Sequence, residues 1–165
     1  MAATDPKIEK SDDNTVEFDI LKIFSKNISL ETPNSPAIFG EEWKPEISVQ
    51  LANLANPLNN DGLAEICLRI TVTAKIGDKT AFLCEVEQAG VFNVKGFNQD
   101  QLGHMQGAFC PNILFPYARE AIDALLVKAG FPPVQLAPVN FDALYAQRLA
   151  EISSEKAAEN AEGNA

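Results

Sequence analysis

Residues 66–76 alternate between two kinds of side chain, and this alternation constrains the fold more than any other feature of the sequence. Apolar side chains occupy one set of positions (Ile66, Leu68, Ile70, Val72, Ala74 and Ile76), and mostly polar ones occupy the other (Cys67, Arg69, Thr71, Thr73 and Lys75). Because successive side chains of a β-strand point to opposite faces, the pattern predicts a strand with one buried face. Gly77 and Asp78 then favour a tight hairpin into a second strand, from residue 79 to residue 88 or a little beyond.

Two further strands are expected before this hairpin. In residues 16–30 the apolar side chains keep mostly to even positions, while Leu21 and Ile23 fall out of phase, which predicts a long strand with a twist or a bulge. Ile47, Val49 and Leu51 alternate with polar residues and predict a shorter strand that begins after Pro45.

The period of the apolar residues changes to that of a helix after residue 97. The helical spacing covers Ala118, Ile122, Leu125, Leu126 and Ala129, and Gly130 is placed to end this helix. Asn140 can cap a last helix. Strands followed by helices are typical of an α+β domain. We expect a four-stranded antiparallel sheet followed by a long helix and a shorter C-terminal helix.

The length and the charge distribution indicate one domain with acidic ends. The chain has 165 residues, enough for one hydrophobic core. We expect residues 15–152 to form this single domain. Residues 1–14 and 153–165 are acidic and have little apolar surface to bury, so we expect two disordered tails.

The composition also excludes several classes of partner. The formal net charge is −10 and no basic stripe is present, which excludes nucleic acid. No apolar run reaches the roughly 18–20 residues of a membrane helix, so we expect no direct membrane insertion. The first residues lack the basic and apolar regions of a secretory signal, which predicts a cytoplasmic protein.

Residues that could carry chemistry are few. Cys67, Cys84 and Cys110 are widely spaced, which favours free thiols over a disulfide framework. A thiol enzyme would need His104, the single histidine, to serve Cys110, and their spacing neither supports nor excludes this. No metal-ligand spacing, phosphate-binding loop or nucleophile elbow occurs. We therefore expect no enzyme activity, no metal and no cofactor.

Aromatic residues gather in segments marked by proline or glycine. They are Phe39, Trp43, Phe92, Phe97, Phe109, Phe115, Tyr117, Phe131 and Phe141. Such rings can plug the ends of a core, or they can line a groove, because they offer large apolar contact at little entropy cost. The pattern alone favours neither interpretation.

Several long strings occur together in one known family. They are "ISLETPNSPAIFGEEWKPE", "LRITVTAKIGDKTAFLCEVEQAGVF", "GAFCPNILFPYARE" and "GFPPVQLAPVNFDALY". Over roughly residues 18–150 the chain resembles the SecB family of bacterial protein-export chaperones. The resemblance implies a cytosolic homotetramer, built as a dimer of dimers, that binds unfolded precursor polypeptides without ATP and passes them to the SecA motor. The alternative is a carrier of a small apolar ligand in the same aromatic groove.

The resemblance also implies roles for individual residues. The groove for unfolded polypeptides would be formed by Phe39, Trp43, Ile47, Val49, Leu51, Phe92, Phe131 and Phe141. The SecA-binding patch would comprise Asn27, Glu31, Leu83 and Glu85, with Asn27 standing where the family often has an aspartate and Glu87 nearby. Contacts between subunits would involve Cys84, Val86, Gln88, Ala118, Ile122, Leu125 and Leu126.

Two prolines lie near the start of the long helix implied by the resemblance. Pro111 and Pro116 predict a bend before or within this helix, since proline is accepted in a first turn but is costly further in. The sequence leaves open whether Tyr117 faces the core or the bound polypeptide.

Overall fold

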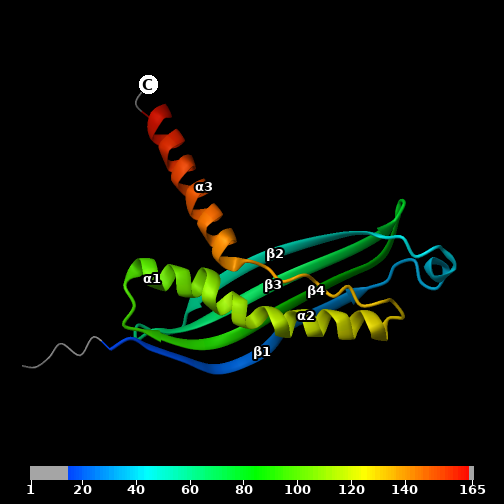
Figure 1. The fold of residues 1–165 in the computed structure, drawn as a ribbon, viewed down its shortest axis with the longest axis horizontal. Helices are drawn as coiled ribbons and strands as arrows, with labels where there is room; N and C mark the ends of the chain where they lie inside the picture. The colour runs from blue at the N-terminus through cyan, green and yellow to red at the C-terminus, as the bar shows by residue number, and fades with distance from the viewer. Residues whose placement is uncertain (1–14, 164–165) are drawn as a thin grey trace, which may run out of the picture.

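The computed structural model describes residues 15–163. Four antiparallel strands form one sheet, and the helices follow them in the chain (Figure 1). The strands are β1 (Glu17–Glu31), β2 (Glu46–Pro57), β3 (Leu63–Ile76) and β4 (Lys79–Lys95), and their order in the sheet is β1-β4-β3-β2. The expected α+β class is confirmed.

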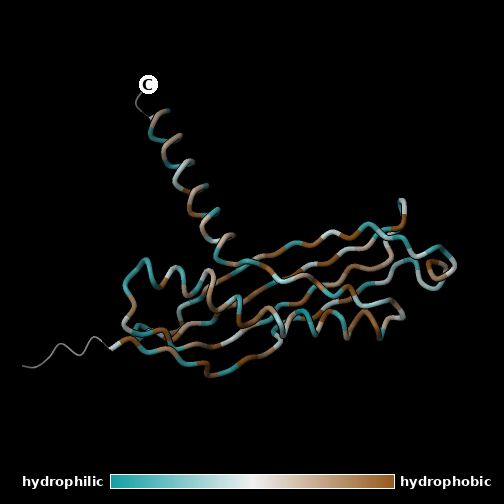
Figure 2. Tube along the Cα trace, viewed as in Figure 1, coloured by the Kyte–Doolittle hydropathy of each residue, from teal (hydrophilic) through white to brown (hydrophobic). Residues whose placement is uncertain are grey.

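The two central strands carry most of the core. On β3 the apolar positions of the alternation are fully buried from Ile66 to Ala74, and on β4 Phe82, Cys84 and Val86 continue the same buried layer. Figure 2 shows this alternation of apolar and polar residues along the strands. β4 runs well past residue 88, because Phe92 and Val94 are also buried on its inner face.

Strand β1 contains the predicted irregularity. Its register against β4 shifts between Ile20 and Lys22 and again between Ser25 and Asn27. The shifts move Ile23 and then Ile28 onto the face that carries the core, opposite Gly90 and Val86. The out-of-phase apolar residues of the sequence are therefore explained by bulges, each of which adds one residue to β1.

One continuous helical segment covers a face of the sheet. It consists of α1 (Gln99–His104), a π-helical turn η2 (Met105–Phe109) and α2 (Cys110–Lys128). Asn98 begins it with a capping box in which its side chain accepts a hydrogen bond from the backbone N–H of Gln101. Figure 1 shows α2 lying along the sheet, where it packs on β4, β3 and β1.

The two prolines have different positions in this segment. Pro111 lies in the first turn of α2, where a missing N–H costs little. Pro116 lies inside α2, where it has no N–H to donate to the carbonyl four residues earlier. The irregularity beside them is the π-helical turn that ends at Phe109.

The chain reverses after α2 and returns along the sheet to α3. Gly130 has φ of +90°, a left-handed conformation that suits glycine and ends the helix as expected. The Asp123 carboxylate of α2 accepts hydrogen bonds from the backbone N–H groups of Val134 and Gln135, at 3.0 and 3.1 Å. These bonds fix the returning segment against α2.

The last helix, α3 (Phe141–Glu162), projects away from the sheet (Figure 1). Asn140 caps it by accepting a hydrogen bond from the Ala143 N–H at 3.0 Å. With 22 residues α3 is longer than α2, which has 19, but it is shorter than the continuous helical segment that includes α1 and η2. Within the described residues, no helix is long and apolar enough to cross a membrane.

The carboxyl-terminal segment differs from the expected tail. Disorder was predicted from residue 153 onward, whereas α3 continues to Glu162. The reason is composition: alanine, glutamate and lysine are good helix formers, so a segment with nothing to bury extends a helix that is already nucleated. Residues 1–14, and the end of the other expected tail, lie outside the described residues.

Candidate functional site

The apolar side chains of β2 lie on the helix-bearing side of the sheet, yet they are exposed. Ile47, Val49 and Leu51 are aligned with the buried residues of β3 (Ala74, Val72 and Ile70) and therefore share their face. Their exposed fractions are 44%, 44% and 37%. Because α2 packs on the other three strands, β2 presents an open apolar stripe. We call Ile47, Val49 and Leu51 the β2 stripe.

An aromatic cluster adjoins the entrance to β2. The rings of Phe39 and Trp43 lie against Phe131, with centroids 5.1 and 5.5 Å apart, and Phe131 lies 5.3 Å from Phe82 of the core. Phe82 and Phe131 are buried, while Phe39 and Trp43 are 50% and 36% exposed. The buried rings thus fix two exposed aromatic surfaces beside the β2 stripe.

A hollow of about 580 Å³ lies between β2 and the start of α3. Leu51, Phe141 and Leu144 contribute apolar surface to it, and Gln147 and Arg148 contribute polar groups. Beside it the Asn53 side chain donates a hydrogen bond to the Gln106 carbonyl at 2.9 Å, which ties β2 to the π-helical turn. The predicted groove residues Leu51 and Phe141 are therefore brought together.

Tyr145 anchors α3 against two glycines of the helical segment. A Cβ placed on Gly103 or Gly107 would lie 2.5 Å from an atom of Tyr145, so only glycine leaves room for this side chain. His104 adds a 2.6 Å contact between its Nε2 and the Asp142 carboxylate in the first turn of α3. The glycine spacing is visible in the sequence, but its purpose depends on where α3 lies.

Phe92 differs from its predicted role in the groove. It is fully buried, and its ring stacks on Phe18 with centroids 5.9 Å apart. A Cβ on Gly90 would lie 2.6 Å from the Phe92 ring, so Gly90 makes the space that this ring occupies. Phe92 is therefore a core residue of β4.

The three thiols are not arranged for catalysis. Cys67, Cys84 and Cys110 are free and buried, and burial raises the pKa of Cys84 to about 11 and that of Cys110 to about 12. A thiol with such a pKa is protonated near neutral pH and is a poor nucleophile. His104, the base that a thiol enzyme would need, contacts Asp142 instead. No cluster of metal ligands occurs among residues 15–163.

The other face of the sheet gathers the residues of the predicted acidic patch. Glu31 lies opposite Leu83 in the register of β1 and β4, and Asn27 lies opposite Glu87. Asn27, Glu31 and Leu83 are exposed, and the Glu85 side chain is 33% exposed. The four predicted residues therefore share one accessible face, away from the β2 stripe.

Comparison with known families identifies the family to which the chain belongs. The family model described as "SecB: Preprotein translocase subunit SecB" matches residues 11–152. The chain belongs to the SecB family. The resemblance to the SecB family is therefore confirmed.

Individual relatives agree with this assignment. The SecB-family chain is 54% identical over 143 residues to the protein-export protein SecB of Thioalkalivibrio sulfidiphilus, covering 87% of this chain and 85% of the relative. It is 51% identical over 147 residues to that of Alkalilimnicola ehrlichii, covering 89% and 78%. Both relatives are thus matched over most of their length.

A solved structure shares the fold. It is a SecB-like chaperone of Mycobacterium tuberculosis in complex with a ChAD peptide from an antitoxin. The TM-score is 0.58 at 15% sequence identity, and the match covers 74% of this chain and 90% of the other. At this identity the likeness establishes the fold alone.

The predicted subunit contacts occupy unexpected places in the SecB-family chain. The inner face of α2 packs on the inner face of the sheet and leaves five of the predicted residues with no exposed surface. They are Cys84, Val86, Ala118, Ile122 and Leu126. Such side chains have no surface left for a second copy, so within one chain they are core residues. Gln88 is buried too, and Ser25 donates a hydrogen bond to it at 3.2 Å.

Two residues of α2 retain surface that the core does not use. Leu125 is only partly buried, and Tyr117 is 50% exposed, so Tyr117 is not a core residue of the single chain. Neither contributes to the hollow beside β2. Sequence reasoning missed Gly103 and Gly107, which leave room for Tyr145 of α3, and Asn53, which ties β2 to the π-helical turn.

Proposed function

We propose that this SecB-family protein is an ATP-independent holdase that binds unfolded precursor proteins along the β2 stripe and delivers them to the SecA motor. The observation that carries the proposal is the open β2 stripe beside the exposed rings of Phe39 and Trp43. A contiguous patch of exposed apolar side chains marks a binding site.

The geometry suits an extended polypeptide. An unfolded client presents apolar side chains at no fixed spacing, so a long open groove serves it better than a closed pocket. β2 is also an edge strand, and its outer backbone groups can pair with an extended chain independently of sequence. The groove therefore offers side-chain contacts and backbone hydrogen bonds along one line.

The acidic face supports docking of SecA. Glu31 and Glu85 lie on neighbouring strands, and Leu83 is exposed between them with an apolar side chain. A partner with basic groups around an apolar contact would complement this patch. The proposal includes assembly of four copies in the cytoplasm, supported by family membership, by the exposed Tyr117 and by the partly buried Leu125 of α2.

Client capture is tested by measuring particle size with and without an unfolded precursor, in the absence of nucleotide. We expect a tetramer that forms a stable complex with the unfolded precursor and none with the folded one. A protein that instead bound one small apolar ligand saturably, and left unfolded chains to aggregate, would be a carrier.

SecA docking is tested by the double variant Glu31→Lys, Glu85→Lys. Affinity for SecA should fall, and the difference from the unmodified protein should shrink as salt is added, since screening weakens exposed charges. Unchanged SecA affinity across salt concentrations would remove this patch from the proposal.

A further inference from the structure

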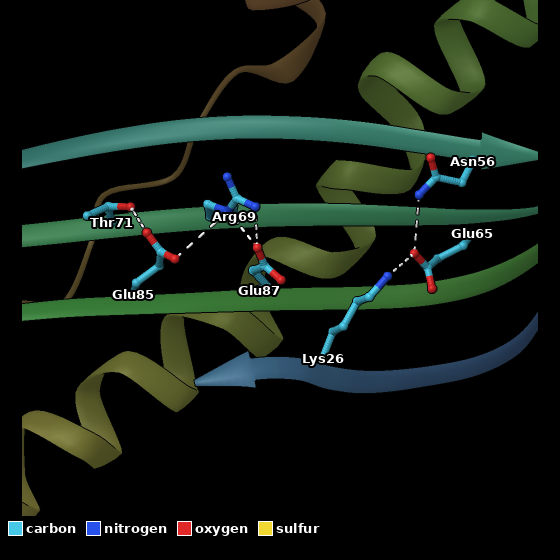
Figure 3. A network of polar contacts seen from close by, with 7 residues as sticks. All are labelled: Lys26, Asn56, Glu65, Arg69, Thr71, Glu85 and Glu87. Atoms are coloured by element: carbon cyan, nitrogen blue, oxygen red, sulfur yellow. Dashed lines mark hydrogen bonds and ion pairs between the residues drawn. The ribbon is translucent and has the colours of Figure 1, made fainter. Parts of the chain in front are cut away.

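A single arginine lies between two glutamates on the acidic face. Figure 3 shows Arg69 of β3 between Glu85 and Glu87, which occupy successive outward positions of β4. The Arg69 Nε donates a hydrogen bond to Glu87 Oε1 at 2.6 Å, and Nη2 contacts the same oxygen. The nearest oxygen of Glu85 is 3.9 Å from Nε. Arg69 is therefore hydrogen-bonded to Glu87 and forms only a longer ion pair with Glu85.

The two glutamates differ in what they offer to a partner. The Glu87 side chain is 13% exposed, whereas that of Glu85 is 33% exposed. Glu85 accepts a hydrogen bond from the Thr71 hydroxyl at 3.0 Å, which fixes its carboxylate without neutralising it. The accessible negative charge thus belongs to Glu85.

Glu87 does not replace the charge that Asn27 lacks. The two residues lie opposite each other in the register of β1 and β4, so Glu87 is close enough to supply a charge near Asn27. Its carboxylate, however, is paired with Arg69. The neighbouring cation, Lys26, is bound to Glu65 at 2.6 Å (Figure 3). Glu87 therefore acts on the patch through Arg69.

Removing the Glu87 charge would leave Arg69 with one nearby carboxylate. The Arg69 guanidinium has five donors on a flexible side chain, and a bond to a carboxylate is roughly twice as strong as a bond to a neutral acceptor. The hydrogen bond that Arg69 donates to Glu87 is also the largest cause of the raised pKa of Arg69, ahead of the charge of Glu85. Without that bond, Arg69 would turn to Glu85.

We propose that Glu87 is a positioning residue that keeps Arg69 from hydrogen-bonding to Glu85, so that the Glu85 carboxylate can bind basic groups of the docking partner. The inference rests on the proposed SecA docking. Glu87 would then affect docking through Arg69, although its own side chain is only 13% exposed.

The test compares five variants in SecA binding at low salt, and one of them, Glu85→Gln, removes the accessible charge directly and should weaken binding. Glu87→Gln should weaken binding roughly three- to tenfold, and Glu87→Leu, which removes the acceptor altogether, at least as much. Glu46→Gln is the matched control, because Glu46 lies on the same face of the sheet, opposite Lys75, and its loss changes the net charge equally. We expect less than about a twofold effect from it. The double variant Arg69→Gln, Glu87→Gln should bind within about twofold of the unmodified protein.

Any other outcome contradicts either the role of Glu87 or the proposed docking patch. If Glu87→Gln weakens binding no more than Glu46→Gln, only net charge matters and the inference is wrong. If the double variant stays weak, Glu87 touches the partner itself and the inference is also wrong. If Glu85→Gln binds normally, the docking patch of the proposed function is wrong.

A crystal structure of Glu87→Gln gives a readout independent of SecA. Arg69 should move onto Glu85, with a nitrogen-to-oxygen distance near 2.9 Å in place of the present 3.9 Å. An Arg69 that stays with residue 87 would overturn the inference even if binding fell.

Discussion

The indole of Trp43 packs on the ring of Phe131, with centroids 5.5 Å apart and an interplanar angle of 33°. One partner is exposed and the other is buried, so the pair joins the surface to the core. Phe131 follows Gly130, whose backbone turns the chain back along the sheet after α2. The position of an exposed aromatic surface therefore depends on how α2 ends.

Trp43→Ala should separate binding from stability. We expect the affinity for an unfolded client to fall about tenfold or more, because large exposed aromatic side chains carry much of the energy of a binding site. The free energy of unfolding should fall by about 1 kcal/mol, which is the typical interaction energy of an aromatic pair. Phe131→Ala should cost about 3–5 kcal/mol of stability, since it removes a buried ring. Client titration and urea unfolding measure the two effects.

Charges on the β2 stripe should abolish client capture. The double variant Val49→Asp, Leu51→Asp places two carboxylates where an apolar client would lie, and light scattering of an aggregating unfolded protein should show that suppression is lost. The tetramer should remain. Leu54→Asp is the matched control, because Leu54 is 47% exposed on the same strand but on the other face. Equal loss in the control would contradict the assignment of the groove.

Gly107→Ala should loosen α3. The added Cβ would lie 2.5 Å from the ring of Tyr145, so Tyr145 must move and α3 loses its anchor. The gain in helix propensity, about 1 kcal/mol, offsets part of the cost. Hydrogen exchange in the first turns of α3 should accelerate. Gly40→Ala, where the Cβ meets nothing within 4 Å, should leave exchange unchanged.

Stability should decline in alkaline solution partly through Cys110. Its pKa is raised from 9.0 to about 12 in the folded chain, so the stabilisation is complete below pH 9 and is lost as pH rises toward 12. The difference in unfolding free energy between the unmodified protein and Cys110→Ala should shrink by at most about 1.4 kcal/mol per pH unit in this window. Urea unfolding at pH 7.5 and 10.5 measures it, and a constant difference would contradict the buried thiol.

Local patterns predicted the elements well where a single physical cause decides them. The alternation in β3, the turn at Gly77, the phase change in β1 and the caps at Gly130 and Asn140 each follow from strand geometry or from orphan backbone groups. In each case the deciding residues are close in sequence.

Burial depended on contacts that no local pattern contains. The apolar stripe of Ala118, Ile122 and Leu126 could have packed on another copy or on its own sheet, and the structure shows the second. Phe92 lies past residue 88, near which the strand was expected to end, whereas β4 continues to Lys95 although Gly90 and Asn93 are weak strand formers. The partner of the glycines at 103 and 107 lies about forty residues later, at Tyr145.

The exposed β2 stripe follows from a difference in width. Strands are spaced about 4.8 Å apart, so four of them are about 14 Å across, while one helix with its side chains is about 10 Å wide. A single helix that is centred on β4 therefore covers the strands on either side and cannot reach β2. The groove therefore does not depend on a cavity within the core. It would persist through any core substitution that leaves α2 in place.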